Sequence, residues 1–211
     1  MKKTILFQGD SITDCGRSRE TENLAPGAGL GVGYPLFVAG RLLCDRPDVE
    51  WCIHNRGISG NRVVDLYARW KIDALNLRPD ILSILIGIND TWHEYGNHNG
   101  VEVPRYAKVY RELLTWTKEI LPNVKLLLMS PFYFPFGAVG PEWPAEVQAR
   151  AAIVEELARD FDAILLPCQK ILDGALARAP QEHWLRDGVH PLGAGHQLLA
   201  DAWLKAAAPI L

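Results

Sequence analysis

Residues 80–86, Asp-Ile-Leu-Ser-Ile-Leu-Ile, are the part of the sequence that most restricts the fold. The run is nearly continuous in Ile and Leu, which suits a central parallel strand that is covered on both faces. Other short, β-prone apolar segments at residues 4–7, 50–55, 124–129 and 163–166 also have the length and composition of strands. The chain therefore predicts a sheet of buried strands.

Helix-like segments alternate with these strands. They lie at residues 34–43, 63–70, 103–120, 146–160, 169–179 and 192–207, and residues 103–120 have apolar side chains at helical spacing. This alternation indicates a parallel sheet with helices on both faces. A chain of 211 residues is long enough for one domain of this kind. We predict an α/β, single-domain, flavodoxin-like three-layer sandwich with a five-stranded parallel sheet over residues 1–211.

Charge and composition exclude several classes of partner. The net charge is -3 and no basic run is present, so we expect no nucleic-acid and no membrane partner. No segment approaches the roughly 20 apolar residues of a membrane span. The four cysteines have no CxxC or zinc spacing and are typical of free thiols. The apolar run after Lys2 and Lys3 is too short for a signal peptide, which predicts a cytoplasmic protein.

Polar residues follow the predicted strands at several places. They are Gly9-Asp10-Ser11, Gly60-Asn61, Gly87-Ile88-Asn89-Asp90 and the final loop from Asp187 to His190. The carboxyl ends of parallel strands share one edge of a sheet, where ligands bind. We therefore expect these residues to meet there. Taken singly, each has a simpler interpretation as a turn, a helix cap or a core histidine.

These residue types together are the components of acyl transfer. Ser11 is the candidate nucleophile, His190 the base and Asp187 the acid that orients His190. The backbone N–H groups of Ser11 and Gly60 and the side-chain amide of Asn89 are candidate donors to an oxyanion.

The same blocks resemble those of the SGNH hydrolase superfamily, also called the GDSL esterase/lipase family. The resemblance covers Gly9-Asp10-Ser11, residues 55–61, residues 87–90 and Asp187-Gly188-Val189-His190-Pro191, in family order along nearly the whole chain. More narrowly, residues 9–17 and 87–92 resemble the bacterial acetylxylan-esterase-like branch. This resemblance implies a hydrolase that removes acetyl groups from carbohydrate esters. Arg186, directly before Asp187, is a variable position at which contacts with the leaving group could differ.

Some residues beside the motifs are candidates for substrate binding. Tyr34, Trp92, Trp184 and Arg186 are possible contacts, although buried aromatic residues more often serve packing. The residues His93, Glu94 and His98 do not have the HExxH spacing, so we interpret them as loop residues and predict no metal site.

For two loops, the sequence does not distinguish a role in the pocket from a role in an interface. The glycines between residues 16 and 33 do not fit GxGxxG, because Val32 and Tyr34 stand where a third glycine is needed, so we predict no nucleotide or other cofactor. A mobile loop near the site is the expectation for this stretch. Residues 132–144 are rich in aromatic residues and proline, and exposed aromatic side chains there would favour a homo-oligomer.

The leading functional hypothesis is a serine esterase that acts on short acyl groups of a small acetylated saccharide, such as a xylo-oligosaccharide. The absence of a long apolar lid helix mildly disfavours the first alternative, a lysophospholipase or acyl-thioesterase of the same superfamily. The second alternative is a non-catalytic flavodoxin-like binding protein, which the complete set of motifs disfavours.

Overall fold

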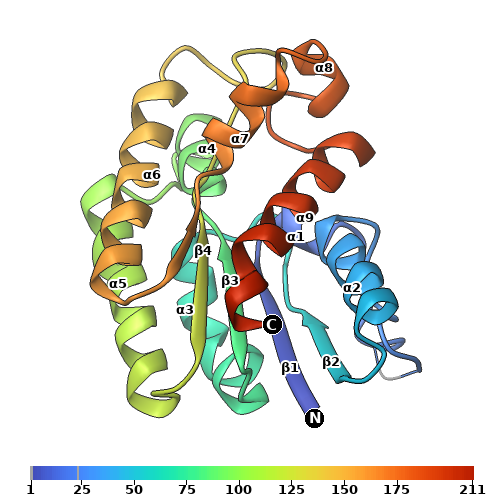
Figure 1. Ribbon diagram of the computed structural model, residues 1–211. Coiled ribbons are helices and arrows are strands. Elements are labelled where there is room, and N and C mark those ends of the chain that lie inside the picture. The colour runs from blue at the N-terminus through green and yellow to red at the C-terminus, as the bar shows by residue number, and fades with distance from the viewer. Residues whose placement is uncertain (1, 23) are drawn as a thin grey trace.

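The computed structural model describes residues 2–22 and 24–211. Its strands form one parallel sheet of five strands in the order β2-β1-β3-β4-β5 (Figure 1). The strands are β1 (Lys2–Gly9), β2 (Glu50–Asn55), β3 (Ile81–Leu85), β4 (Lys125–Met129) and β5 (Ile164–Leu166). The predicted α/β fold with a five-stranded parallel sheet is confirmed.

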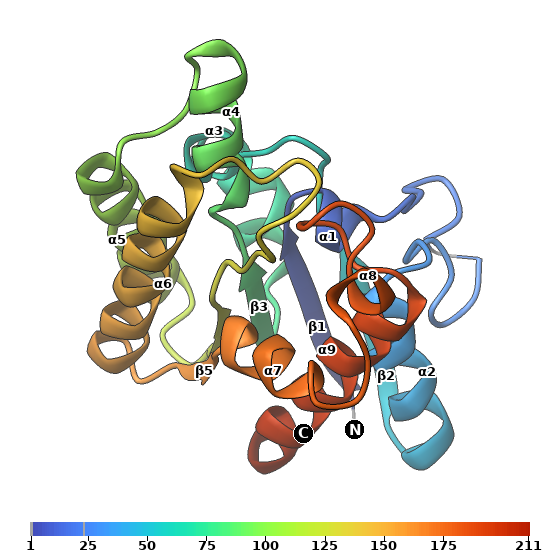
Figure 2. The ribbon, with the colours of Figure 1, turned by 90° about the horizontal axis from the view of Figure 1, so that it is seen from above.

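Helices cover both faces of the sheet (Figure 2). One face carries α2 (Tyr34–Asp45), α7 (Cys168–Ala175) and α9 (Gly193–Ala207), and the other carries α3 (Val63–Asp73), α5 (Val103–Ile120) and α6 (Trp143–Asp160). The shorter helices are α1 (Ser11–Asp14), α4 (Ile88–Asn97) and α8 (Gln181–Trp184), with 3₁₀ turns at Leu75–Leu77 and Ala208–Ile210. None of the helices in the described part of the chain combines the length and apolarity needed to cross a bilayer.

Strand residues alternate between two cores. Ile5 and Phe7 pack into the core under α2 and α9, whereas Leu6 between them packs into the core under α3 and α5. In β3, Leu82 and Ile84 pack toward α3 and α5, and every residue of the strand is buried. The high content of Ile and Leu in β3 therefore follows from its place between two apolar layers.

Helix α4 is the main element that the sequence did not predict. We interpreted His93 and Glu94 as loop residues, and a turn was the simpler alternative for Asn89-Asp90. Asn, Asp and Gly in this segment are poor helix formers. Contacts with the rest of the fold stabilise the helix despite this composition. Its first turn is buried, and the Thr91 hydroxyl accepts a hydrogen bond from Arg150 of α6 at 2.9 Å.

The aromatic side chains of residues 132–144 are buried, or half-buried in the case of Tyr133 and Phe136, which corrects our expectation of exposed aromatic side chains. Phe132, Phe134 and Trp143 are each at most 3% exposed. The loop backbone also binds the turn that contains Asp187, because Phe134 N–H donates to the Gly188 carbonyl at 2.7 Å and Ala138 N–H to the Asp187 carbonyl at 2.9 Å. The loop supports that turn, and self-association stays a prediction.

Arg150 is a charged residue in the interior. Its side chain is fully buried, ion-pairs with Glu146 at 2.8 Å and bonds Thr91 and the Val101 carbonyl. Arg150 thereby joins α6 to α4 and to the segment before α5. Removing one partner of such a buried network leaves polar groups without hydrogen bonds.

Arg150→Met should lower the free energy of unfolding by about 2–4 kcal/mol, because the Val101 carbonyl and the Thr91 hydroxyl lose their donor. Urea unfolding measures this change. Arg111→Met is the matched control, since Arg111 pairs with Asp160 while both side chains are about half exposed, and it should cost about 1 kcal/mol or less. Equal losses for the two variants would contradict the assigned role of Arg150.

Two buried carboxyl groups lie beside the carboxyl edge of the sheet. Burial raises the pKa of Asp10 from 3.8 to about 7, against the hydrogen bond from Ile12, and the nearby charge of Asp90 adds to the rise. Burial likewise raises the pKa of Asp90 to about 7, although the Val63 N–H and the Arg150 charge oppose it. The folded chain therefore holds protons that the unfolded chain releases, and the free energy of unfolding falls as pH rises from 3.8 to about 7.

Asp90→Asn should reduce this loss of stability with rising pH. The substitution removes the ionisable group and keeps a side-chain oxygen that can accept from Val63 N–H, a bond of 3.1 Å in the native chain. Urea unfolding at a series of pH values, for wild type and variant, measures the difference in slope. An unchanged slope between pH 3.8 and about 7 would show that Asp90 is ionised throughout this range.

Candidate active site

Ser11 lies directly beyond the end of β1. The strand ends at Gly9, and the Asp10 carboxylate caps α1 by accepting from Ile12 N–H at 3.0 Å. Ser11 is the first residue of α1. Its backbone N–H is therefore in the first turn of a helix, where such groups have no partner within the helix.

The turn between α8 and α9 positions His190 and Asp187. One oxygen of Asp187 accepts from the backbone N–H groups of Val189 and His190, at 3.1 and 2.9 Å, and the other accepts from His190 Nδ1 at 2.8 Å. Gly188 has φ of +86°, and a Cβ atom there would lie 2.3 Å from the Phe136 carbonyl oxygen. Only glycine fits between the turn and the aromatic loop.

Ser11, His190 and Asp187 form a continuous hydrogen-bonded series. The Ser11 hydroxyl lies 2.9 Å from His190 Nε2, on the opposite side of the ring from Asp187. Burial alone would raise the pKa of Asp187, but hydrogen bonds from the His190 backbone and ring, together with the His190 charge, hold it below its usual range. The carboxylate is therefore ionised and fixes the proton of the ring on Nδ1, which leaves Nε2 free to accept the serine proton.

The predicted oxyanion donors lie in the same pocket as Ser11. Gly60 has φ of +82° in the turn closed by the Asn61 N–H bond to the Ile58 carbonyl, a conformation that favours glycine. The Asn89 amide donates to the Asn61 carbonyl at 3.1 Å, which leaves its second N–H for a ligand. Ser11, Gly60 and Asn89 all line the pocket.

Hydrogen bonds hold the segment of Asn55 to Asn61 against the nucleophile turn. The Asn55 amide donates to the Thr13 carbonyl at 2.6 Å, and Ile58 N–H donates to the Gly9 carbonyl at 3.1 Å. These bonds fix the position of Gly60 relative to Ser11.

The pocket has a volume of about 510 Å³ and opens to solvent. Of the predicted substrate contacts, Trp92 and Arg186 line it. The Trp92 ring lies 5.6 Å from the His190 ring, and Arg186 is largely exposed with a long 3.4 Å contact to Asp187.

The prediction that Tyr34 and Trp184 contact substrate is wrong. Tyr34 is fully buried and its hydroxyl pairs with Thr13 at 3.1 Å, while Trp184 is only 6% exposed and donates to the Ala179 carbonyl at 3.2 Å. Neither lines the pocket. Both positions are used for packing, the simpler interpretation for aromatic residues.

Sequence reasoning missed other residues that line the pocket: Cys15, Ser59, His93 and His196. His196 Nδ1 accepts from Tyr34 N–H at 3.2 Å, and burial, followed by the charge of His190, lowers the pKa of His196 to about 4. Cys15 lies one helical turn after Ser11, and His196 follows His190 on the next helix. This proximity to the motifs was the available signal.

His93 and His98 do not form a metal site in the structure. Across residues 2–22 and 24–211, no three histidine, cysteine, aspartate or glutamate side chains lie close enough to hold a metal ion. His93 faces the pocket, whereas His98 ends α4 with φ of 55°.

Comparisons with known proteins agree with this geometry. Residues 7–198 match the GDSL-like Lipase/Acylhydrolase family. The chain is 36% identical to an acetylxylan esterase from Geobacillus stearothermophilus, over 95% of this chain and 92% of that protein. A crystal structure described as a GDSL-like lipase, from Parabacteroides merdae, is 42% identical, with a TM-score of 0.93 over 98% of this chain and 95% of that chain. The crystal structure of the Geobacillus esterase is 34% identical, with a TM-score of 0.86 over 97% and 93%.

The spacing of the site residues is also shared. Catalytic mutants of the Geobacillus esterase replace a serine, an aspartate or a histidine by alanine. Its serine and histidine are 179 residues apart and its aspartate and histidine 3 apart, the same separations as Ser11–His190 and Asp187–His190 here. The chain belongs to the GDSL-like lipase/acylhydrolase family and is a carboxylic ester hydrolase.

Proposed function

We propose that this hydrolase removes short acyl groups, chiefly acetyl, from xylo-oligosaccharides or related carbohydrates through an acyl-enzyme on Ser11. The observation that carries the proposal is the hydrogen-bonded series Ser11–His190–Asp187, which opens into a pocket shared with Gly60 and Asn89. The similarity to an acetylxylan esterase over nearly the whole chain supports acetyl as the acyl group.

The first half of the reaction forms the acyl-enzyme. His190 Nε2 takes the proton of the Ser11 hydroxyl, which lies 2.9 Å away, while the oxygen attacks the ester carbonyl carbon. Asp187 stabilises the charged imidazolium. The N–H groups of Ser11, Gly60 and Asn89 bind the oxyanion of the tetrahedral intermediate, and each such donor is worth about 3 kcal/mol in typical serine hydrolases. His190 then protonates the leaving sugar hydroxyl.

The second half releases the acid. Water enters the open pocket, His190 takes its proton, and the hydroxide attacks the acyl carbon through a second oxyanion at the same donors. Ser11 leaves with the proton from His190, and acetate is released. No step needs a metal or organic cofactor, because the residues of the chain supply the nucleophile, the base and the charge stabilisation.

The walls of the pocket favour a small polar substrate. Trp92 presents an aromatic ring beside His190, a surface on which sugar rings stack. Arg186, at the rim, is the candidate hydrogen-bond donor to sugar hydroxyls. We therefore place the acyl group between Ser11 and Asn89 and the saccharide toward Trp92 and Arg186.

Ser11→Ala should reduce kcat for an aryl acetate by roughly 10⁴-fold or more, because the nucleophile is lost. Ser59→Ala is the matched control, since Ser59 also lines the pocket but its hydroxyl binds Asp14 at 3.2 Å, outside the series. A serine-directed phosphonate should label wild type and Ser59→Ala but not Ser11→Ala, as mass spectrometry of the intact protein would show. Near-native turnover by a folded Ser11→Ala variant would refute the mechanism.

The acyl and alcohol specificities require a separate test. The kcat/KM for aryl esters should be highest for acetate and decrease toward octanoate, and defined acetylated xylo-oligosaccharides should release acetate. Lysophospholipid and acyl-thioester substrates serve as comparisons. A rise in kcat/KM with chain length would instead assign the chain to the lipid or thioester branch, and the Ser11 mechanism would still hold.

A further inference from the structure

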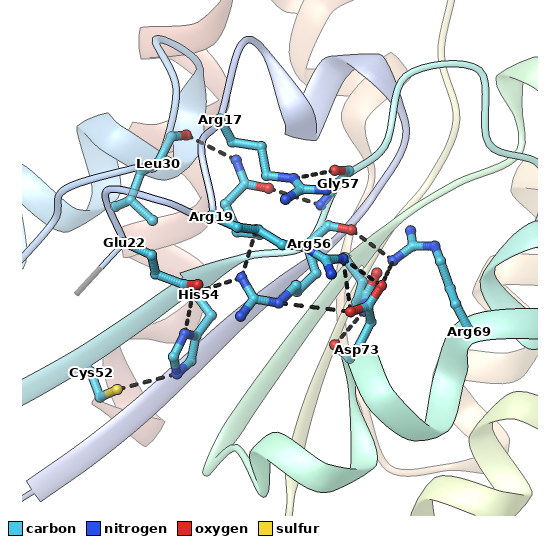
Figure 3. A network of polar contacts seen from close by, with 12 residues as sticks. Arg17, Arg19, Glu22, Leu30, Cys52, His54, Arg56, Gly57, Arg69 and Asp73 are labelled. Atoms are coloured by element: carbon cyan, nitrogen blue, oxygen red, sulfur yellow. Dashed lines mark hydrogen bonds and ion pairs between the residues drawn. The ribbon is translucent and has the colours of Figure 1, made fainter.

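A second nucleophile–base–acid cluster lies outside the esterase pocket. Cys52 and His54 are on the same face of the edge strand β2, and Glu22, from the segment between α1 and α2, lies against them (Figure 3). None of the three lines the pocket around Ser11. The mechanism proposed above makes no use of them.

The hydrogen bonds define the orientation of the His54 ring. His54 Nδ1 pairs with the Glu22 carboxylate, and His54 Nε2 lies 3.2 Å from Cys52 Sγ. Burial opposes ionisation of Glu22, but hydrogen bonds from Arg56 and His54 lower its pKa below the usual range. An ionised carboxylate accepts the Nδ1 proton, which leaves the lone pair of Nε2 facing the thiol. This is the tautomer that a base for Cys52 requires.

The other cysteine–histidine pair has the opposite arrangement. His196 Nε2 lies 3.5 Å from Cys15 Sγ, but His196 Nδ1 accepts from Tyr34 N–H. The proton of a neutral His196 is therefore on Nε2, which donates to the sulfur and cannot accept from it. Burial also raises the pKa of Cys15. The Cys15 thiol consequently lacks a base.

Arginine side chains gather beside the Glu22–His54 pair. Figure 3 shows Arg17, Arg19, Arg56 and Arg69 in one network with Glu22 and Asp73. Arg56 bonds Glu22 at 2.7 Å and lies 3.9 Å from Asp73, while Arg19 and Arg69 also pair with Asp73. The arginines of this network favour the approach of an anionic reagent over a cationic one.

The four thiols differ in accessibility, and Cys52 and Cys15 are both partly exposed. Cys52 is partly exposed, Cys168 is buried, and Cys44 is exposed. In the described part of the chain, no hydrogen bond to the Cys44 sulfur is present, so Cys44 provides an internal reference for an exposed thiol without a base.

We propose that Cys52 is a covalent modification site, where the thiol exchanges with an anionic low-molecular-weight disulfide to form a mixed disulfide. His54 Nε2 takes the thiol proton, and the Cys52 sulfur attacks one sulfur of the disulfide. A new S–S bond forms as the bond in the reagent breaks. The leaving sulfur takes the electron pair and the proton from His54, so one thiol is consumed and one is released. Glu22 holds His54 in the required orientation.

The test uses the whole folded protein and oxidised glutathione as the anionic disulfide. Peptide mass spectrometry follows glutathione adducts at each cysteine over time. In the wild type, Cys52 should react faster than the more exposed Cys44. Cystamine, a cationic disulfide, should lose most of this preference because it is repelled by the arginines. A rate at Cys52 equal to or below that at Cys44 with oxidised glutathione would overturn the proposal, and this comparison needs no variant.

Variants test the roles of the two supporting residues. His54→Gln should lower the rate at Cys52 by roughly tenfold or more, because the base is lost, and leave the rate at Cys44 unchanged. Glu22→Gln should lower the rate at Cys52 by a smaller factor, since His54 remains as the base. His196→Gln, which alters the other cysteine–histidine pair, should leave Cys52 unaffected. Unchanged aryl acetate hydrolysis by His54→Gln would show that the fold is intact, and an unchanged rate at Cys52 in that folded variant would contradict the role of His54.

Discussion

The hydrogen bond between Ser11 and His190 joins residues 179 positions apart, and the proposed chemistry depends on it. Each partner is positioned by a different part of the fold. Ser11 follows the inner strand β1, whereas His190 lies in a turn that the aromatic loop after β4 supports through Gly188. The parallel pairing of β1, β3 and β4 brings both supports to one edge of the sheet. Any change that tilts the Asp187–His190 turn would therefore separate the base from the nucleophile.

Two buried carboxyl groups, Asp10 and Asp90, position the segments behind the site, and their burial lowers the stability of the fold at neutral pH. Asp10 caps the helix that begins with Ser11, and Asp90 binds the N-terminus of α3, yet both carboxyls are buried and resist ionisation. One oxygen of Asp10 has no partner among the described residues. Such groups stabilise particular local geometries more than the fold as a whole. The segment from Arg17 to Glu22 is also held by polar contacts, because Glu22 pairs with His54 of β2 and with Arg56, and Arg19 pairs with Asp73 of α3.

The sequence predicted the site better than it predicted the walls around it. Ser11, Asp187 and His190 form one hydrogen-bonded series, and Gly60 and Asn89 share its pocket, because all follow strands or lie in the loop beside them. Trp92 and Trp184 both lie beside motif residues in the sequence, yet of these two only Trp92 lines the pocket. Periodicity cannot show which neighbour an aromatic ring meets. The cytoplasmic location and self-association both stay predictions.

Local physics, readable from the sequence, determined the strands, most of the helices and the parallel sheet, because hydrophobic periodicity reports which faces are buried. It also determined the identity of the reactive groups, since few residue types can serve as nucleophile, base and oxyanion donor. Only the tertiary structure decided that α4 is helical, that Tyr34 belongs to the core and that His54 presents a free ring nitrogen to Cys52. Each of these depends on contacts between segments distant in the chain, such as Arg150 with Thr91 and Glu22 with His54, whose energies outweigh local propensity.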